Sequence, residues 1–515
     1  MNARATFLLL LTATATPLAA QTGSGRALSV SSWASPYVEQ LIRAGVLRGL
    51  DPLTRPLRRG DVAQALAAVD STALSASTRA TVRMLQREFE DTAVAEDSVR
   101  WRIEAAGGLL AASDPSRWAL RPGADSGRVY PQLGVEASLE MPHLVLVTHP
   151  RIDNRLKYDP DYHGRQDRFV AGRNEDAYAA YESRFLGLFF GTVDRNWGPP
   201  ETEGLLLSPS SYGFDHLLVR LGPRRLRVEL LATQLDDLTP WGDSTHPVSR
   251  ALTLHRLVAV PSDAIAFSLF EGVVYAGTAN DPRSVEPWYL NPLNSLLLEE
   301  YQNVPPSNAL VGVDVSARAG GTARLAGQFY LDDFQIDRKT AADREPPSYG
   351  LTLVGTGGWG RGAGSWSALY TRVTNLAYRT PARQEQYTQR GLGIGRNWSD
   401  YDQATVRATA NAAPRLLASL ELTWLRQGEG DFRLQYPQVG DYPTTPTFLQ
   451  GVVERTARVA VQAVWTPASD ITVSADVGRH FIANAGHVSG RSASRWVWRL
   501  GLEVRRGAEG TLHLP

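Results

Sequence analysis

From about residue 100 almost to its end, the chain is a succession of short segments in which apolar and polar side chains alternate. One of the clearest has Leu416, Ala418, Leu420, Leu422 and Trp424 on one side and Ser419, Glu421 and Thr423 on the other. Successive side chains of a β-strand point to opposite faces, so each segment is predicted to be a strand with one apolar and one polar side. A long series of such strands is typical of a transmembrane β-barrel, whose outer face contacts lipid.

The first 20 residues resemble a secretory signal peptide. Arg4 supplies a positive charge, residues 7–11 are apolar, and small residues precede the expected cleavage before Gln21. The apolar run is too short to cross a bilayer as a helix, and no later run approaches the ~18 apolar residues that such a helix needs. We therefore expect export to the periplasm, the outer membrane or the exterior.

Composition excludes several classes of function. The chain has no cysteine, which rules out disulfides and thiolate metal sites. Its formal net charge is zero, so it has no positive excess with which to bind nucleic acid. We predict no cofactor and no metal.

The predicted elements divide the chain into a signal peptide (1–20), a helical segment (21–97) and a barrel (98–515). Helical spacing of apolar residues predicts helices near 37–44, 59–69 and 78–89. The candidate strands cover residues 101–112, 130–140, 143–149, 178–193, 214–221, 225–233, 251–260, 265–276, 309–319, 322–333, 349–356, 364–374, 403–412, 415–426, 455–466, 470–482 and 494–506. The fold class is therefore all-β, a transmembrane barrel of about 18 antiparallel strands in which tight turns alternate with long loops.

Two parts of the chain resemble the Wzi capsule-assembly family. Residues 37–47 and 55–66 are similar to its N-terminal helical part. Asp194-Arg195-Asn196-Trp197-Gly198-Pro199-Pro200, followed by Leu205-Leu206-Leu207-Ser208, is similar to its Trp-Gly-Pro and Leu-x-Leu-Ser segment, and residues 287–293 are similar to another. The resemblance implies an 18-stranded outer-membrane barrel with a periplasmic helical bundle. It also implies a role in binding and retaining capsular or extracellular polysaccharide at the cell surface. From the signal peptide and the serial amphipathic strands we predict a closed monomer in outer-membrane lipid.

The helical segment has a second resemblance, to surface-layer homology modules, which some carbohydrate porins carry before the barrel. The alternative function is therefore a carbohydrate porin tethered to the cell wall.

Three motifs that could indicate other chemistry are better explained by the barrel. The glycine-rich run 355–360 precedes an alternating strand and not the helix that a dinucleotide site needs. The run from Asp159 to Val170 lacks the final glutamate of a calcium loop. Ser474, Asp476 and His480 are too far apart along one strand for a hydrolytic triad. We predict that the protein is not an enzyme.

The candidate ligand-binding residues are Arg195, Trp197, Trp288, Tyr289 and Asn291. Arginine forms bidentate hydrogen bonds with carboxylates, and aromatic rings stack on sugars, although the same residues could simply pack a turn. Ten polar positions are predicted to face the lumen: Arg227, Glu229, Arg324, Gln328, Arg407, Glu421, Arg458, Gln462, Asp476 and Arg499. Their mixed charges favour a plugged interior. The alternative interpretation is that arginines near the outer mouth bind an acidic polysaccharide. Loop aromatics, which could stack on sugars or line the membrane interface, are Tyr158, Tyr162, Tyr301, Tyr387, Trp398, Tyr401, Tyr436 and Tyr442, besides Trp288 and Tyr289.

Overall fold

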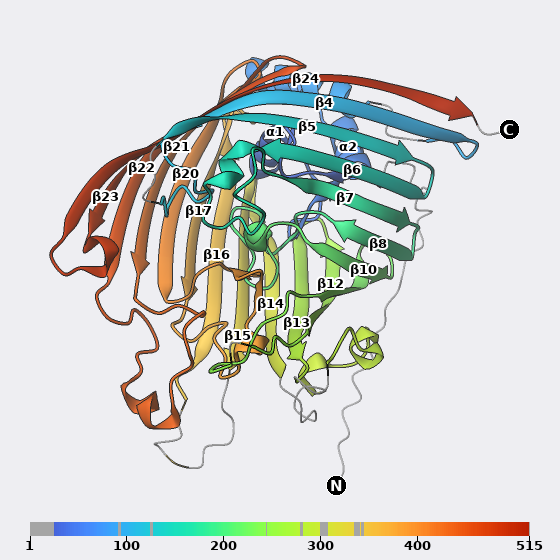
Figure 1. Cartoon of the computed structure of the whole chain (residues 1–515). Helices are drawn as coiled ribbons and strands as arrows, with labels where there is room; N and C mark the ends of the chain where they lie inside the picture. The colour runs from blue at the N-terminus through green and yellow to red at the C-terminus, as the bar shows by residue number, and fades with distance from the viewer. Residues whose placement is uncertain are drawn as a thin grey trace, which may run out of the picture.

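The computed structural model is a closed antiparallel barrel of 18 strands with a small helical unit at one end (Figure 1). It describes residues 25–513 except 91–93, 124–126, 244, 279–281, 299–306, 334–339 and 341–344. The predicted signal peptide lies outside these residues. Strands pair with their neighbours in sequence, and β24 closes the barrel by pairing with β4.

The barrel strands are β4 (Ser98–Ala112), β5 (Arg128–Glu140), β6 (Leu144–Asp153), β7 (Gly172–Glu182), β8 (Leu186–Thr192), β10 (Asp215–Leu221), β11 (Leu226–Gln234), β12 (Arg250–Ser262), β13 (Ile265–Ala276), β14 (Ser307–Gly320), β15 (Ala323–Asp333), β16 (Ser348–Trp359), β17 (Gly364–Val373), β20 (Tyr401–Ala413), β21 (Leu416–Gln427), β22 (Glu454–Ala468), β23 (Ile471–Ala483) and β24 (Ser492–His513). The short pairs are β1 (Ala27–Leu28) with β3 (Leu57–Arg58), β2 (Thr54–Arg55) with β9 (Asn196–Trp197), and β18 (Thr388–Gln389) with β19 (Leu392–Gly393).

Strand β21 shows why these sequences close into a barrel in lipid. Leu420 and Leu422 are each 50% exposed on its outer face, whereas Glu421 between them is 4% exposed and faces the lumen. This is the reverse of a soluble protein, and it confirms the face assignment made from the alternation. Closure also leaves no unpaired sheet edge within the hydrocarbon layer.

One predicted strand, residues 178–193, is two strands. The chain reverses between β7 and β8 at residues 183–185, where the amide of Ser183 donates to the carbonyl of Leu186 at 2.8 Å. The turn contains no glycine, proline or asparagine, so apolar alternation runs through it without a break. Strand β24 also continues to His513, beyond its predicted end at residue 506.

The three predicted helices are confirmed as α1 (Ser35–Arg43), α2 (Arg59–Ala67) and α3 (Ala76–Glu88). They share a buried core that includes Tyr37, Leu41, Val62 and Leu85. Gly45 follows α1 with a φ of +71°, the left-handed conformation in which glycine ends a helix without strain. No helix in the described part of the chain is both long and apolar enough to cross a bilayer.

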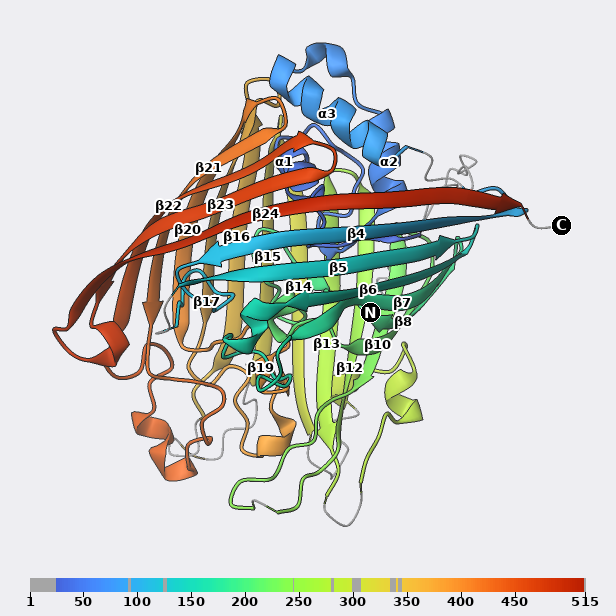
Figure 2. The ribbon, with the colours of Figure 1, turned by 45° about the horizontal axis from the view of Figure 1, so that its top comes forward.

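The helical unit lies at the barrel end that carries the tight turns, opposite the long loops (Figure 2). The Tyr37 hydroxyl donates to the carbonyl of Arg415 at 2.7 Å, and the Thr78 hydroxyl donates to the carbonyl of Gly362 at 3.0 Å. Both carbonyls belong to tight turns, between β20 and β21 and between β16 and β17. The unit is therefore fastened to the rim of the barrel.

The loop after α1 enters the lumen. Asp51 accepts a hydrogen bond from Arg227 at 2.7 Å, and the carbonyl of Leu53 accepts one from Arg256 at 3.0 Å. Although burial alone raises the pKa of Asp51, Arg227 and Arg256 outweigh it and hold this pKa at about 2. The ionised carboxylate of Asp51 thus holds the loop against the arginines of the barrel wall.

Inward-folded loops fill much of the interior. A buried apolar cluster joins Leu205, Leu206 and Leu207 with Tyr378, Tyr387, Ile394 and Phe432, and with wall residues such as Leu254 and Phe270. Rings of Tyr378 and Tyr330 stack with centroids 4.9 Å apart. The lumen thus contains a hydrophobic core as well as the predicted mixed charges.

Candidate functional site

A cavity of about 310 Å³ lies inside the barrel between the inward loops and the wall of β20 to β23. Five arginines and four acidic side chains line it, together with Trp118, Trp398 and Tyr401. A cavity of this volume has room for a sugar ring, since drug-sized ligands occupy pockets from about 300 Å³ upward.

The first wall is the connection between β4 and β5, which folds into the lumen. It carries Trp118, whose ring meets that of Trp398 edge to face, with centroids 4.8 Å apart. The indole N–H of Trp118 donates to Asp161 in the loop between β6 and β7. Neighbouring loops therefore fix the orientation of the tryptophan pair, which lies partly exposed to the cavity.

Arg121 extends from the same connection across the aromatic wall. Its guanidinium lies 4.0 Å from the ring centroid of Trp398 and 5.0 Å from that of Tyr401, and it donates to Gln427 at 2.6 Å. Burial lowers the pKa of Arg121 to about 10, so the group stays cationic at neutral pH. A positive charge is thus stacked beside rings that could cover a sugar.

The opposite wall is a ladder of charges on neighbouring strands. Glu421 accepts hydrogen bonds from Arg407 and Arg458, and Arg458 also donates to Asp476. Gln462 donates to Asp476 at 3.2 Å. These residues confirm the predicted lumen-facing positions, and their pairing holds the wall rigid.

Several donors around the cavity have no acceptor among the described residues. They are Nη2 of Arg117 and the Nε atoms of Arg396 and Arg458, all buried. Arg396 otherwise donates to Thr202 at 2.9 Å and to Glu203 at 3.1 Å. Buried guanidinium N–H groups require an acceptor, which a ligand hydroxyl or carboxylate, or ordered water, could provide.

Arg195 and Trp197 lie elsewhere in the lumen. Trp197 is 1% exposed, belongs to the apolar cluster and has the guanidinium of Arg256 5.2 Å from its ring centroid. Arg195 lies 4.2 Å from the ring centroid of Phe189 and donates to His216 at 2.6 Å. Gly198 follows with φ of +128°, and a Cβ there would lie 2.8 Å from Gln328, so the turn needs glycine.

Trp288, Tyr289 and Asn291 lie on the outside of the barrel. Their segment packs on β12 and β13, where Tyr289 stacks on Tyr275 with ring centroids 4.2 Å apart. The structure therefore does not bring them together with Arg195 and Trp197, and ligand binding by these five residues stays a prediction. Tyr301 falls outside the described residues.

Sequence reasoning named only part of the cavity wall. Arg407, Glu421, Arg458, Gln462 and Asp476 followed from strand alternation, and Trp398 and Tyr401 from the loop aromatics. It missed Arg117, Trp118, Arg121 and Arg396 because a loop has no periodicity that shows whether it folds inward. The one available signal was a tryptophan between arginines in residues 117–121.

The stretch that begins like a calcium loop has a structural role. Asp159 is buried and paired with Arg155, while Asp161 accepts the Trp118 hydrogen bond. Among the described residues, no three histidine or acidic side chains gather closely enough to hold a metal ion.

No protein-family model matches the sequence, and no curated protein matches it. The chain is similar to the structure of Wzi from Escherichia coli, titled as an outer-membrane protein involved in group 1 capsule assembly and a carbohydrate-binding β-barrel. The TM-score is 0.61 at 14% identity, covering 93% of this chain and 99% of that one. It also matches Acinetobacter baumannii OccAB1 (TM-score 0.47, 10% identity, 79% and 96% covered) and Pseudomonas aeruginosa OprD (0.44, 11%, 81% and 97%).

The closed antiparallel barrel with an apolar outer wall defines an outer-membrane β-barrel protein. Within that class, the chain has a Wzi-like fold.

Proposed function

We propose that this protein binds an extracellular polysaccharide non-covalently and retains it at the cell surface, and that capsular polysaccharide is its ligand. The binding site is the lumenal cavity, with a sugar stacked against Trp118 and Trp398. The flanking arginines donate to hydroxyl or carboxylate oxygens of the polymer. The acidic side chains opposite accept from its hydroxyl groups.

One observation carries the proposal: the cavity combines partly exposed aromatic rings with buried arginine N–H groups that have no acceptor in the part of the chain that the structure describes. Ring faces cover the C–H face of a pyranose, while fixed donors select for oxygen-rich ligands. The similarity to Wzi, titled as a carbohydrate-binding barrel, supports the same ligand class. Many weak contacts along one polymer would add through effective concentration.

The first test measures polysaccharide retention in the native host. Cells that carry Trp118→Ala or Arg121→Gln should shed polysaccharide that wild-type cells retain. Trp118→Ala removes a stacking ring, and Arg121→Gln removes a positive charge. Binding of the purified polymer to detergent-extracted protein should fall at least tenfold for each variant. Phe169→Ala is the matched aromatic control, since Phe169 is 89% exposed on a loop away from the cavity.

Trp288→Ala discriminates between the cavity and the outer-wall segment. If Trp288→Ala releases polysaccharide while Trp118→Ala does not, the binding site lies on the outside of the barrel. If neither cavity variant changes retention at normal barrel levels, the proposal is wrong.

A further inference from the structure

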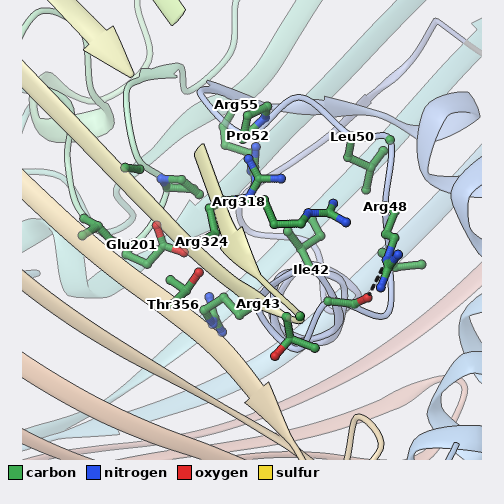
Figure 3. A pocket seen from close by; sticks show the side chains of 18 residues that line it. Ile42, Arg43, Arg48, Leu50, Pro52, Arg55, Glu201, Arg318, Arg324 and Thr356 are labelled. Atoms are coloured by element: carbon green, nitrogen blue, oxygen red, sulfur yellow. Dashed lines mark hydrogen bonds between the residues drawn. The ribbon is translucent and has the colours of Figure 1, made fainter. Parts of the chain in front are cut away.

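A second, smaller pocket lies at the end of the barrel that carries the helices. It is enclosed by α1, the loop that follows α1, residues Pro200 and Glu201, and the walls of β14 to β16. Five arginines line it, at positions 43, 48, 55, 318 and 324, against a single carboxylate, Glu201 (Figure 3).

Most of this positive charge is not neutralised. Arg55 forms a bidentate ion pair with Glu39, at 2.6 and 3.0 Å. Among the described residues, the side chains of Arg48 and Arg324 donate only to neutral oxygens. Arg48 donates to the main-chain oxygen of Gly45, and Arg324 donates to the Ser316 hydroxyl and to the main-chain oxygen of Asp263. Within the described ranges, the guanidinium groups of Arg43 and Arg318 form neither a hydrogen bond nor an ion pair.

Glu201 does not neutralise this excess of positive charge. Its carboxylate attracts Arg43 electrostatically but lies outside ion-pair distance of every described guanidinium. Burial raises the pKa of Glu201, and Arg43 only partly opposes that effect. The pocket therefore holds several partly buried cations and one carboxylate whose charge burial disfavours.

The size of the pocket limits its occupant. Its volume is about 40 Å³, against about 310 Å³ for the cavity above, and Glu201 lines both. A water molecule needs about 10–15 Å³ of such a pocket, so the smaller pocket has room for one oxyanion group and not for a sugar ring.

We propose that this pocket is a binding site for an oxyanion group, a carboxylate or a phosphate, which enters from the helix-bearing end. Arg43, Arg318 and Arg324 hold the group by charge-assisted hydrogen bonds, a role that guanidinium geometry favours. Exposed Arg48 stands at the entrance. Glu201 opposes binding and separates the anion from the lumenal cavity.

Calorimetric titration of the detergent-extracted full-length protein tests this site, with inorganic phosphate and acetate as probes and glucose as the neutral control. Wild type should bind at least one anion, and not glucose, with an affinity that falls as salt rises. Arg43→Gln and Arg318→Gln should each weaken binding at least tenfold. Glu201→Gln should tighten it several-fold, because a repelling charge is removed without loss of volume.

Arg83→Gln is the matched control, because Arg83 is exposed on α3 and does not line the pocket. Whichever anion binds more tightly assigns the group as phosphate or carboxylate. Absence of binding by both anions, or equal weakening by Arg83→Gln, would overturn the proposal. The Glu201→Gln variant keeps the test valid if an arginine variant fails to assemble. Trp118→Ala should leave anion affinity unchanged, so this site and the polysaccharide site can fail independently.

Discussion

At the scale of residues, the same side-chain types serve opposite purposes in one lumen. Arg256 is fully buried and satisfied by Leu53, Thr54 and Asp314, so it ties the helical unit to the wall. Arg117 and Arg396, which line the cavity, retain N–H groups without acceptors among the described residues. The number of satisfied donors, and not the residue type, therefore separates structural arginines from candidate ligand-binding ones.

We expect Trp197 to have a structural role, because its side chain is packed in the apolar cluster. Trp197→Ala should destabilise the barrel by about 3–5 kcal/mol, as large-to-small changes in a packed core do. Trp197→Phe, which keeps an aromatic ring, should cost less. Heat-modifiable migration of the extracted protein against temperature measures both. A fully stable Trp197→Ala barrel that no longer retains polysaccharide would instead place Trp197 in the binding site.

At the scale of elements, strands were predictable and the destinations of loops were not. The alternation of Leu420, Glu421 and Leu422 determines which side chains contact lipid, because a one-residue shift would bury the apolar set in a polar lumen. The connection carrying Trp118 has no such constraint, and its inward fold depends on Asp161 and Gln427, distant in sequence. The smaller, arginine-lined pocket is likewise formed where α1 meets β14 and β15, and no local sequence pattern predicts this contact.

The tight turns and the helical unit share one end of the barrel, and short turns of outer-membrane barrels face the periplasm. We therefore predict that α3 is periplasmic and that the loop carrying Phe169 is extracellular. The absence of native cysteine allows a direct test with the single substitutions Arg83→Cys and Phe169→Cys. On intact cells, a membrane-impermeant maleimide should label Phe169→Cys and should label Arg83→Cys only after the outer membrane is opened. Labelling of Arg83→Cys on intact cells would invert the topology.

At the scale of the whole molecule, three barriers to flow lie in series along the lumen. The helical unit covers the tight-turn end, Asp51 and Leu53 are bound to wall arginines, and the cluster around Tyr378 and Tyr387 fills the middle. A barrel of 18 strands would otherwise be wide enough for an aqueous channel. We therefore predict that the lumen holds a retained ligand and does not conduct a diffusing one, and this is the property in which polysaccharide binding differs from the carbohydrate-porin alternative.

Because of these barriers, the protein should conduct poorly in planar bilayers. Removing residues 25–90 should raise conductance only slightly, because the apolar cluster lies deeper in the lumen. A further replacement of residues 377–397 by a short Gly-Ser linker should open the lumen, since it removes Tyr378, Tyr387 and Ile394 from the cluster together. Heat-modifiable migration must first show that each variant still forms a closed barrel. Large, steady, sugar-blockable conductance of the wild-type protein would contradict the plugged lumen and favour the porin.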